Sequence, residues 1–271
     1  MSKEERQNMI RNLGINRILW LCNAFFSLIA AFVGVFRPGI YSRVVSSEIL
    51  PGVISQDLLT LLAAVILLFF TLRGNPESPK KQIGILGLLG YLFYAYGIYA
   101  IEQVYNVLYF LYLAIFGLSF YSLIYAVASM RQEILQEVEV RDPIRKISVG
   151  FSLFIAILFS LLWIAMLMPL IQSGQRIEYT YSIYILDLSF IMPAFAILAV
   201  MTATNRGLGL ILTPALYVLG ATLLFPVGLG EIIKPFFNLS TDLSGVPLYF
   251  GISILFFVLV VIYLRDLKIP A

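Results

Sequence analysis

Four acidic residues, Asp57, Glu102, Asp187 and Glu231, stand at or just inside the ends of long apolar runs. Asp187 lies about one helical turn inside its run, and a charge in such surroundings usually faces a polar interior or water. If the four carboxylates converge, they form an acidic vestibule that could relay protons or cations. The structural alternative is that Asp57 caps a helix, that Glu102 and Glu231 end helices in water, and that Asp187 hydrogen-bonds to neighbouring Tyr or Ser residues.

Tyrosines are the second candidate group, because the chain has 16 of them. Tyr105, Tyr109, Tyr112 and Phe116 share one face of an expected helix, and Tyr96 lies on the preceding helix. Two facing aromatic stripes predict a pocket for an apolar or cationic ligand, with Tyr112 as the deepest candidate. An aromatic belt at the membrane interface combined with helix packing explains the same pattern.

The missing residue types exclude several chemistries. The chain has no histidine and a single cysteine, Cys22, so haem ligation, most metal sites, a redox pair and an internal disulfide are excluded. No phosphate-binding loop with Gly-x-x-x-x-Gly-Lys occurs, and all the lysines lie outside the apolar runs. We therefore expect no cofactor, no metal ion and no catalytic residue set.

The composition indicates that lipid surrounds these residues. Of 271 residues, 61% are hydrophobic and 12% are charged, and the mean hydropathy is +0.94. A soluble domain has about 25% charged residues, so a soluble enzyme, a nucleic-acid-binding protein and a secreted disulfide scaffold are excluded. The sequence predicts an all-α membrane bundle with eight transmembrane helices. The apolar runs are Ile18–Phe36, Leu58–Leu72, Ile83–Ile101, Val107–Met130, Ile147–Leu170, Ile183–Thr202, Leu208–Val227 and Val246–Leu264.

The positive charges predict the orientation. With eight spans, four of the 18 Lys and Arg residues (Arg37, Arg43, Arg176 and Lys234) fall on one side, and the other 14 fall on the side of both termini. Because the basic side faces the cytoplasm, both termini are expected there, in a cell membrane. The basic excess also suits contact with anionic lipid headgroups, although it could be an orientation signal alone.

The segment 131–146 is the longest connection on the basic side. Ile134, Leu135 and Val138 are spaced as in a short amphipathic helix at the membrane surface. A solvated linker between two halves is the equal alternative.

An internal duplication would explain two offsets. The first and fifth apolar runs begin at Ile18 and Ile147, which are 129 residues apart. The Asp-Leu pairs that begin with Asp57 and Asp187 are 130 residues apart. Four spans per half give a parallel repeat, as in some transporters. The chain is then one transmembrane domain, 1–271, with halves 18–130 and 147–264 joined by 131–146.

The chain resembles a widespread group of uncharacterised prokaryotic multi-pass integral membrane proteins. The resemblance rests on Pro38-Gly39-Ile40-Tyr41, Gln56-Asp57-Leu58, Leu89-Gly90-Tyr91-Leu92-Phe93-Tyr94, Tyr109-Phe110-Leu111-Tyr112, Leu186-Asp187-Leu188 and Thr213-Pro214-Ala215-Leu216. It covers most of the first seven spans. Members often carry Lys-Gly after the last motif, whereas this chain has Tyr217 there. The resemblance implies a prokaryotic inner or plasma membrane and draws attention to Asp57 and Asp187, but it implies no activity.

Three functions are consistent with these features. The first is a transporter or channel-like protein for a small cationic or neutral solute, with an outward acidic vestibule. The second is a non-catalytic sensor or the subunit of a protein partner that the sequence does not identify, and the third is a membrane-embedded enzyme for a lipid or isoprenoid. We rank transport first, and we expect lipid but no nucleic acid as a partner.

Overall fold

The computed structural model describes residues 8–73 and 78–270, and this part of the chain is helical apart from its connections and isolated bridges. Eight of its helical stretches are long and apolar enough to cross a membrane, which confirms the predicted all-α bundle with eight spans. The spans are α1 (Leu13–Phe36), α2 (Leu50–Leu72), α3 (Pro79–Ile101), α4 (Tyr109–Ala128), α6 (Asp142–Ser173), α7 (Tyr181–Leu186) with α8 (Met192–Ala203), α9 (Gly207–Leu223) with α10 (Phe225–Ile233), and α11 (Val246–Asp266). Lys3 and Arg6, which the charge count places on the basic side, lie outside the described residues.

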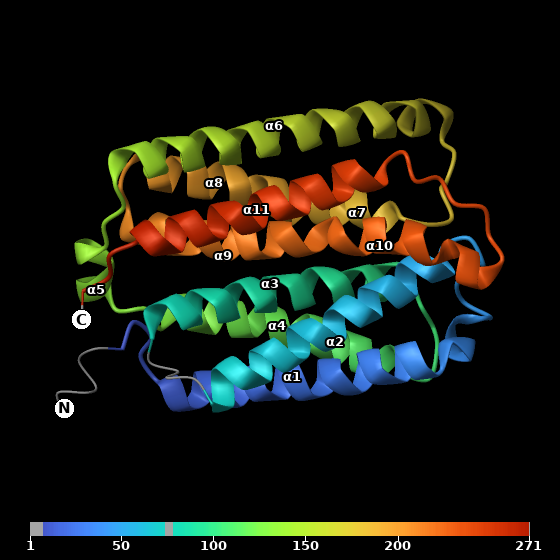
Figure 1. Cartoon of the computed structure of the whole chain (residues 1–271), viewed down its shortest axis with the longest axis horizontal. Coiled ribbons are helices and arrows are strands. Elements are labelled where there is room, and N and C mark those ends of the chain that lie inside the picture. Colours follow the sequence, from blue (N-terminus) through green and yellow to red (C-terminus); the bar gives the residue numbers. More distant parts are fainter. Residues whose placement is uncertain (1–7, 74–77, 271) are drawn as a thin grey trace.

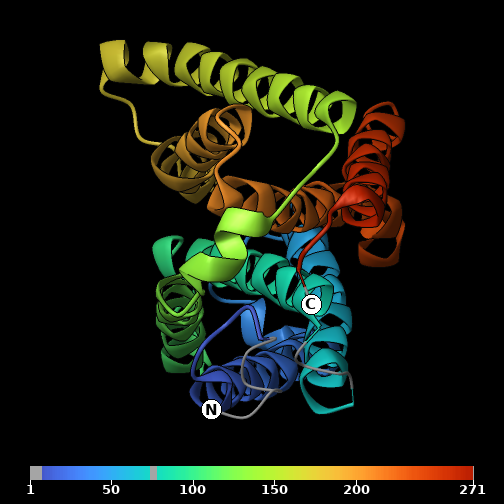
Figure 2. The same cartoon turned by 90° about the vertical axis from the view of Figure 1, so that its left-hand side faces the viewer.

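The helices form two groups that meet along their length (Figure 1, Figure 2). In the first group α1 packs against α2 and α4, and α3 packs against α4. In the second group α6 packs against α8, and α9 packs against α8 and α11. The groups touch mainly where α3 contacts α9 and where α2 contacts α10. Residues of both groups can therefore reach a shared space between them.

Both ends of the described chain lie at the same end of the bundle. Ile10 forms an isolated bridge with Met130, and Glu139 forms one with Lys268. Both bridges lie in the connection from α4 to α6, which also holds the short helix α5 (Gln132–Glu137) with Ile134 and Leu135 buried. A helix in the segment 131–146 is thereby confirmed, and an even number of spans returns the chain to its starting side (Figure 1).

Helix α2 begins earlier than its apolar run predicts. It starts at Leu50, with Pro51 in its first turn, where the missing N–H of proline costs no hydrogen bond. Asp57 consequently lies two turns inside the helix, and the expectation that it caps the helix start is wrong.

Prolines interrupt the sixth and seventh spans. A π-helical turn, η3 (Asp187–Ile191), joins α7 to α8 and ends two residues before Pro193. In the seventh span the helix breaks at Leu224, just before Pro226, whereas Pro214 is kept inside α9. Proline lacks the N–H of a regular helical hydrogen bond, so both breaks follow from the sequence.

Gly87 sets how closely the two groups approach, and Gly87→Ala is expected to lower the free energy of unfolding by about 2 kcal/mol. A β-carbon at residue 87 would lie 2.7 Å from the carbonyl oxygen of Ala215 and closer still to the Val218 side chain. Thermal unfolding in detergent measures the effect, with Gly150→Ala as the control because nothing lies within 4 Å of its β-carbon position. Equal melting temperatures for the two variants would contradict this role of Gly87.

Candidate functional site

A cavity of about 500 Å³ lies between the two helix groups. Residues from α2, α3, α6, α7, η3, α8, α9, α10 and α11 line it. Glu48, Thr180 and Lys234, from the connections at the end away from the chain termini, also line it. The cavity therefore extends from that end of the bundle into the interior, where it reaches Asp187 and Phe195.

Asp187 is the acidic group in the interior of this cavity, and its residue is 5% exposed. The Trp163 indole Nε1 donates a hydrogen bond of 2.8 Å to Oδ2 of Asp187. The Tyr94 hydroxyl is a second potential hydrogen-bond donor to this carboxylate. Within the described part of the chain, however, no hydrogen bond of regular length and angle reaches Oδ1. A buried carboxylate oxygen without a regular hydrogen bond is costly, so this atom is available to a ligand.

The π-helical turn explains how Asp187 reaches this position. Asp187 is the first residue of η3, and Asp187 and Ile191 are buried while Ser189 is exposed on the other side of the turn. A π-turn widens the helix locally, and such turns occur frequently at functional sites.

Aromatic side chains line the cavity that contains this carboxylate. Tyr91, Tyr94, Trp163, Phe195 and Phe256 all line the cavity, and most of these side chains are buried. Aromatic ring faces carry partial negative charge and attract cations. The interior of the cavity thus combines the Asp187 carboxylate with several rings, which is the combination that recognises organic cations.

The open end of the cavity carries an ion pair. Lys234 Nζ donates to Oε1 of Glu231 at 2.6 Å, and both side chains are about one quarter exposed. Oε2 of Glu231 is buried and, among the described residues, has no hydrogen-bond partner. Glu231 and Asp187 are therefore the two candidate carboxylates that the structure brings to one cavity.

Asp57 lies elsewhere, in a cluster of tyrosines inside the first helix group. The Tyr41 hydroxyl donates to Oδ2 at 2.7 Å, and the Tyr99 hydroxyl donates to Oδ1 at 2.9 Å. The Tyr112 hydroxyl lies 3.3 Å from that of Tyr41 and accepts a hydrogen bond from Asn106 at 3.1 Å. Because both oxygens of Asp57 have donors, we interpret this cluster as structural.

Tyr41 contributes a donor from outside the spans. It belongs to the short helix η2 (Pro38–Tyr41) between α1 and α2, and its side chain is fully buried. Burial, and to a lesser degree the neighbouring Asp57, raises the pKa of Tyr41 far above its ordinary value. The hydroxyl therefore stays protonated at neutral pH and holds this connection against α2.

The other candidates lie apart from the cavity. Tyr96 donates to the Ser27 carbonyl oxygen at 3.3 Å, and Tyr109 donates to the Ala100 carbonyl oxygen at 3.0 Å. Glu102 accepts a hydrogen bond from the Ser182 backbone N–H at 2.8 Å, in the first turn of α7. The four acidic residues thus occupy three separate environments instead of one vestibule.

Sequence reasoning missed the partners of both aspartates. Trp163 is not among the predicted site residues, because the sequence of an apolar helix does not show which group the indole N–H of a tryptophan contacts. Tyr41 lies in one of the motifs that carry the family resemblance, although nothing there indicated its hydrogen bond.

Comparisons with protein-family models, curated proteins and solved structures found no match. The resemblance to prokaryotic membrane proteins therefore stays a prediction. In the described part of the chain, no group of three acidic or cysteine side chains could hold a metal ion.

Proposed function

We propose that this protein binds a small organic cation in its central cavity, with Asp187 as the counter-ion, and carries it across a cell membrane of prokaryotic type. The termini face the cytoplasm in this proposal, so the cavity opens outward. The observation that carries it is the unpartnered Oδ1 of Asp187 in an aromatic-lined cavity.

A cation is the ligand that best complements this cavity. A buried carboxylate is stable when an opposite charge or enough donors compensate for its lost hydration, and one oxygen of Asp187 has no hydrogen bond of regular geometry. An ammonium or quaternary ammonium group would supply the charge, and its hydrocarbon part would contact the rings of Tyr94, Trp163 and Phe256. The volume of about 500 Å³ is typical of small-molecule sites.

The arrangement of the helices supports movement of the solute. Helices interrupted near the binding site and paired halves that rock against each other are features of secondary transporters. Here η3 lies at Asp187, and the break between α9 and α10 lies beside the same cavity. The contacts of α3 with α9, of α2 with α10 and of α3 with α7 also agree with a two-fold parallel repeat, which we include in the proposal.

The test compares benzyltrimethylammonium with neopentylbenzene, its uncharged carbon isostere. We expect the cation to raise the melting temperature of the purified protein and to accumulate in proteoliposomes that contain the protein. The isostere should bind at least about tenfold more weakly, because it offers no charge to Asp187. Equal binding of both compounds would contradict the cation site. Cation binding without uptake would contradict transport and favour a sensor.

The ion pair between Lys234 and Glu231 at the open end of the cavity leads to a further prediction. Lys234→Ala leaves Glu231 without its cation, so the potential at the cavity entrance becomes more negative. We expect benzyltrimethylammonium to bind about threefold more tightly. Arg37→Ala is the control, because it removes an exposed positive charge from the same predicted side without touching the cavity lining. Weaker binding in Lys234→Ala would contradict this arrangement.

A further inference from the structure

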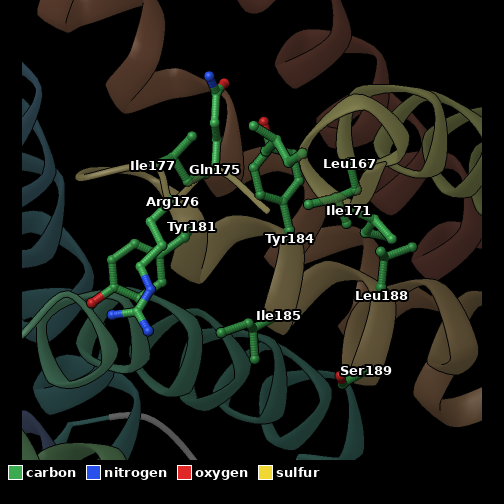
Figure 3. A pocket seen from close by; sticks show the side chains of 11 residues that line it. Leu167, Ile171, Gln175, Arg176, Ile177, Tyr181, Tyr184, Ile185, Leu188 and Ser189 are labelled. Atoms are coloured by element: carbon green, nitrogen blue, oxygen red, sulfur yellow. The ribbon is translucent and has the colours of Figure 1, made fainter. Parts of the chain in front are cut away.

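A second hollow, of about 680 Å³, lies on the outer surface of the second helix group. We call it the α6–α7 groove, because Leu167, Ile171, Ile185 and Leu188 line it from the end of α6 and from α7 and η3 (Figure 3). Helix α6 has 32 residues, which span about 48 Å. That length exceeds the hydrocarbon core of a bilayer, about 30 Å, so the groove near its end reaches headgroup depth.

The lining of the groove is apolar with one cationic edge. Leucine and isoleucine side chains form most of its wall, and Arg176 is the single charged residue among the described residues that line it. Figure 3 shows Arg176 beside Tyr181 on one side, with Leu167, Ile171 and Leu188 on the opposite side. A long hydrocarbon chain with an anionic group at one end matches this distribution.

The groove and the central cavity share a wall. Tyr184 lines the groove, and its ring packs edge-on against Trp163 at a centroid distance of 5.3 Å. Trp163 in turn lines the cavity and binds Asp187. Leu188 and Ser189 face the groove from the same π-helical turn that carries Asp187.

We propose that the α6–α7 groove binds one anionic phospholipid of the outer leaflet. Its phosphate pairs with the Arg176 guanidinium, which forms bidentate hydrogen bonds with phosphate oxygens. One acyl chain lies along Ile171, Ile185 and Leu188, whose hydrocarbon side chains form an apolar wall for it. This site is separate from the solute cavity and does not depend on its ligand.

Trp163 provides a nearby probe, because its ring packs against Tyr184 in the wall of the groove and the chain has only two tryptophans. In a Trp20→Phe background, the protein is reconstituted in phosphatidylcholine that contains a small fraction of lipid with brominated acyl chains, which quench indole fluorescence over a short distance. Brominated phosphatidylglycerol should quench Trp163 about twice as strongly as brominated phosphatidylcholine at the same fraction, corresponding to roughly 0.4 kcal/mol of preference. Arg176→Ala should abolish the difference, whereas Arg43→Ala, which removes an exposed charge elsewhere on the predicted outer side, should keep it.

Equal quenching by the two lipids in the parent protein would overturn the proposal, and so would a difference that persists in Arg176→Ala. Native mass spectrometry of the unsubstituted chain gives a second measurement that does not need Trp20→Phe. There, phosphatidylglycerol should stay bound to the parent protein and be lost from Arg176→Ala. Retention in both would again overturn the site.

Discussion

Gly34→Ala is expected to lower the free energy of unfolding by about 3 kcal/mol, because it breaks the hydrogen bonds of a buried carboxylate. A β-carbon at residue 34 would lie 2.6 Å from the Tyr41 hydroxyl oxygen and closer still to Oδ2 of Asp57. Asp57 is only 1% exposed, so displacement of the Tyr41 hydroxyl leaves a buried carboxyl oxygen without a donor or a water to replace it. Of the two glycine substitutions, this one should have the larger effect.

Thermal unfolding in detergent checks the Gly34 prediction. A loss of 3 kcal/mol corresponds to a melting temperature about 6–12 °C lower. Gly117→Ala in α4 is the matched control, because nothing lies within 4 Å of its β-carbon position and alanine favours a helix. A Gly34→Ala protein as stable as Gly117→Ala would show that Asp57 and Tyr41 do not hold the connection between α1 and α2.

Under the predicted repeat, Asp57 and Asp187 would occupy equivalent positions, but their surroundings differ. Trp163 follows Gly34 by 129 residues, and Asp187 follows Asp57 by 130, so both pairs match the offsets of the predicted repeat. Because Gly34 has no side chain, the Tyr41 hydroxyl can approach Asp57 there and donate a hydrogen bond to Oδ2. Tyr99 donates a hydrogen bond to the other oxygen, Oδ1. At Trp163 a large side chain supplies one donor and leaves Oδ1 of Asp187 open. We infer that one half keeps a structural carboxylate and the other keeps a ligand-binding one.

The fold was predictable from the sequence because helices that are surrounded by lipid appear as long apolar runs. Long apolar runs marked all eight spans, whereas prolines alone do not predict the interruptions: the helix breaks near Pro193 and Pro226, but Pro214 stays inside α9. The start of α2 was missed because Gln56 and Asp57 interrupt its apolar pattern, although these polar groups point into the protein.

The candidate site was predictable only in part. Asp187 stood out because a charge inside a span is costly, but the aromatic rings around it come from helices far apart in the sequence. Lipid-facing and buried sides of these helices are both apolar, so periodicity could not show which tyrosines face the cavity and which stabilise Asp57. Only the packing of the helices shows that Tyr94 lines the cavity, whereas Tyr112 belongs to the cluster around Asp57.

Asp187→Asn is expected to weaken benzyltrimethylammonium binding about 100-fold, or roughly 2.7 kcal/mol, because it removes the counter-ion from a desolvated site. Asparagine has nearly the same shape and keeps an oxygen that accepts the Trp163 hydrogen bond, so the fold should be retained. Neopentylbenzene, which contacts only the rings, should bind the variant and the parent protein alike. The substitution thus removes the preference for charge and leaves the apolar contacts.

Asp242→Asn is the matched control, because it removes one negative charge from the same predicted side of the membrane. Its carboxylate is exposed, does not line the cavity and accepts a hydrogen bond from the Ser244 N–H, which lowers the pKa of Asp242. Asp242 is therefore ionised at neutral pH, and the variant changes the net charge as Asp187→Asn does. If both variants weaken cation binding equally, the general surface potential governs binding. If only Asp187→Asn does so, the cation pairs with the one carboxylate that the π-helical turn presents to the cavity.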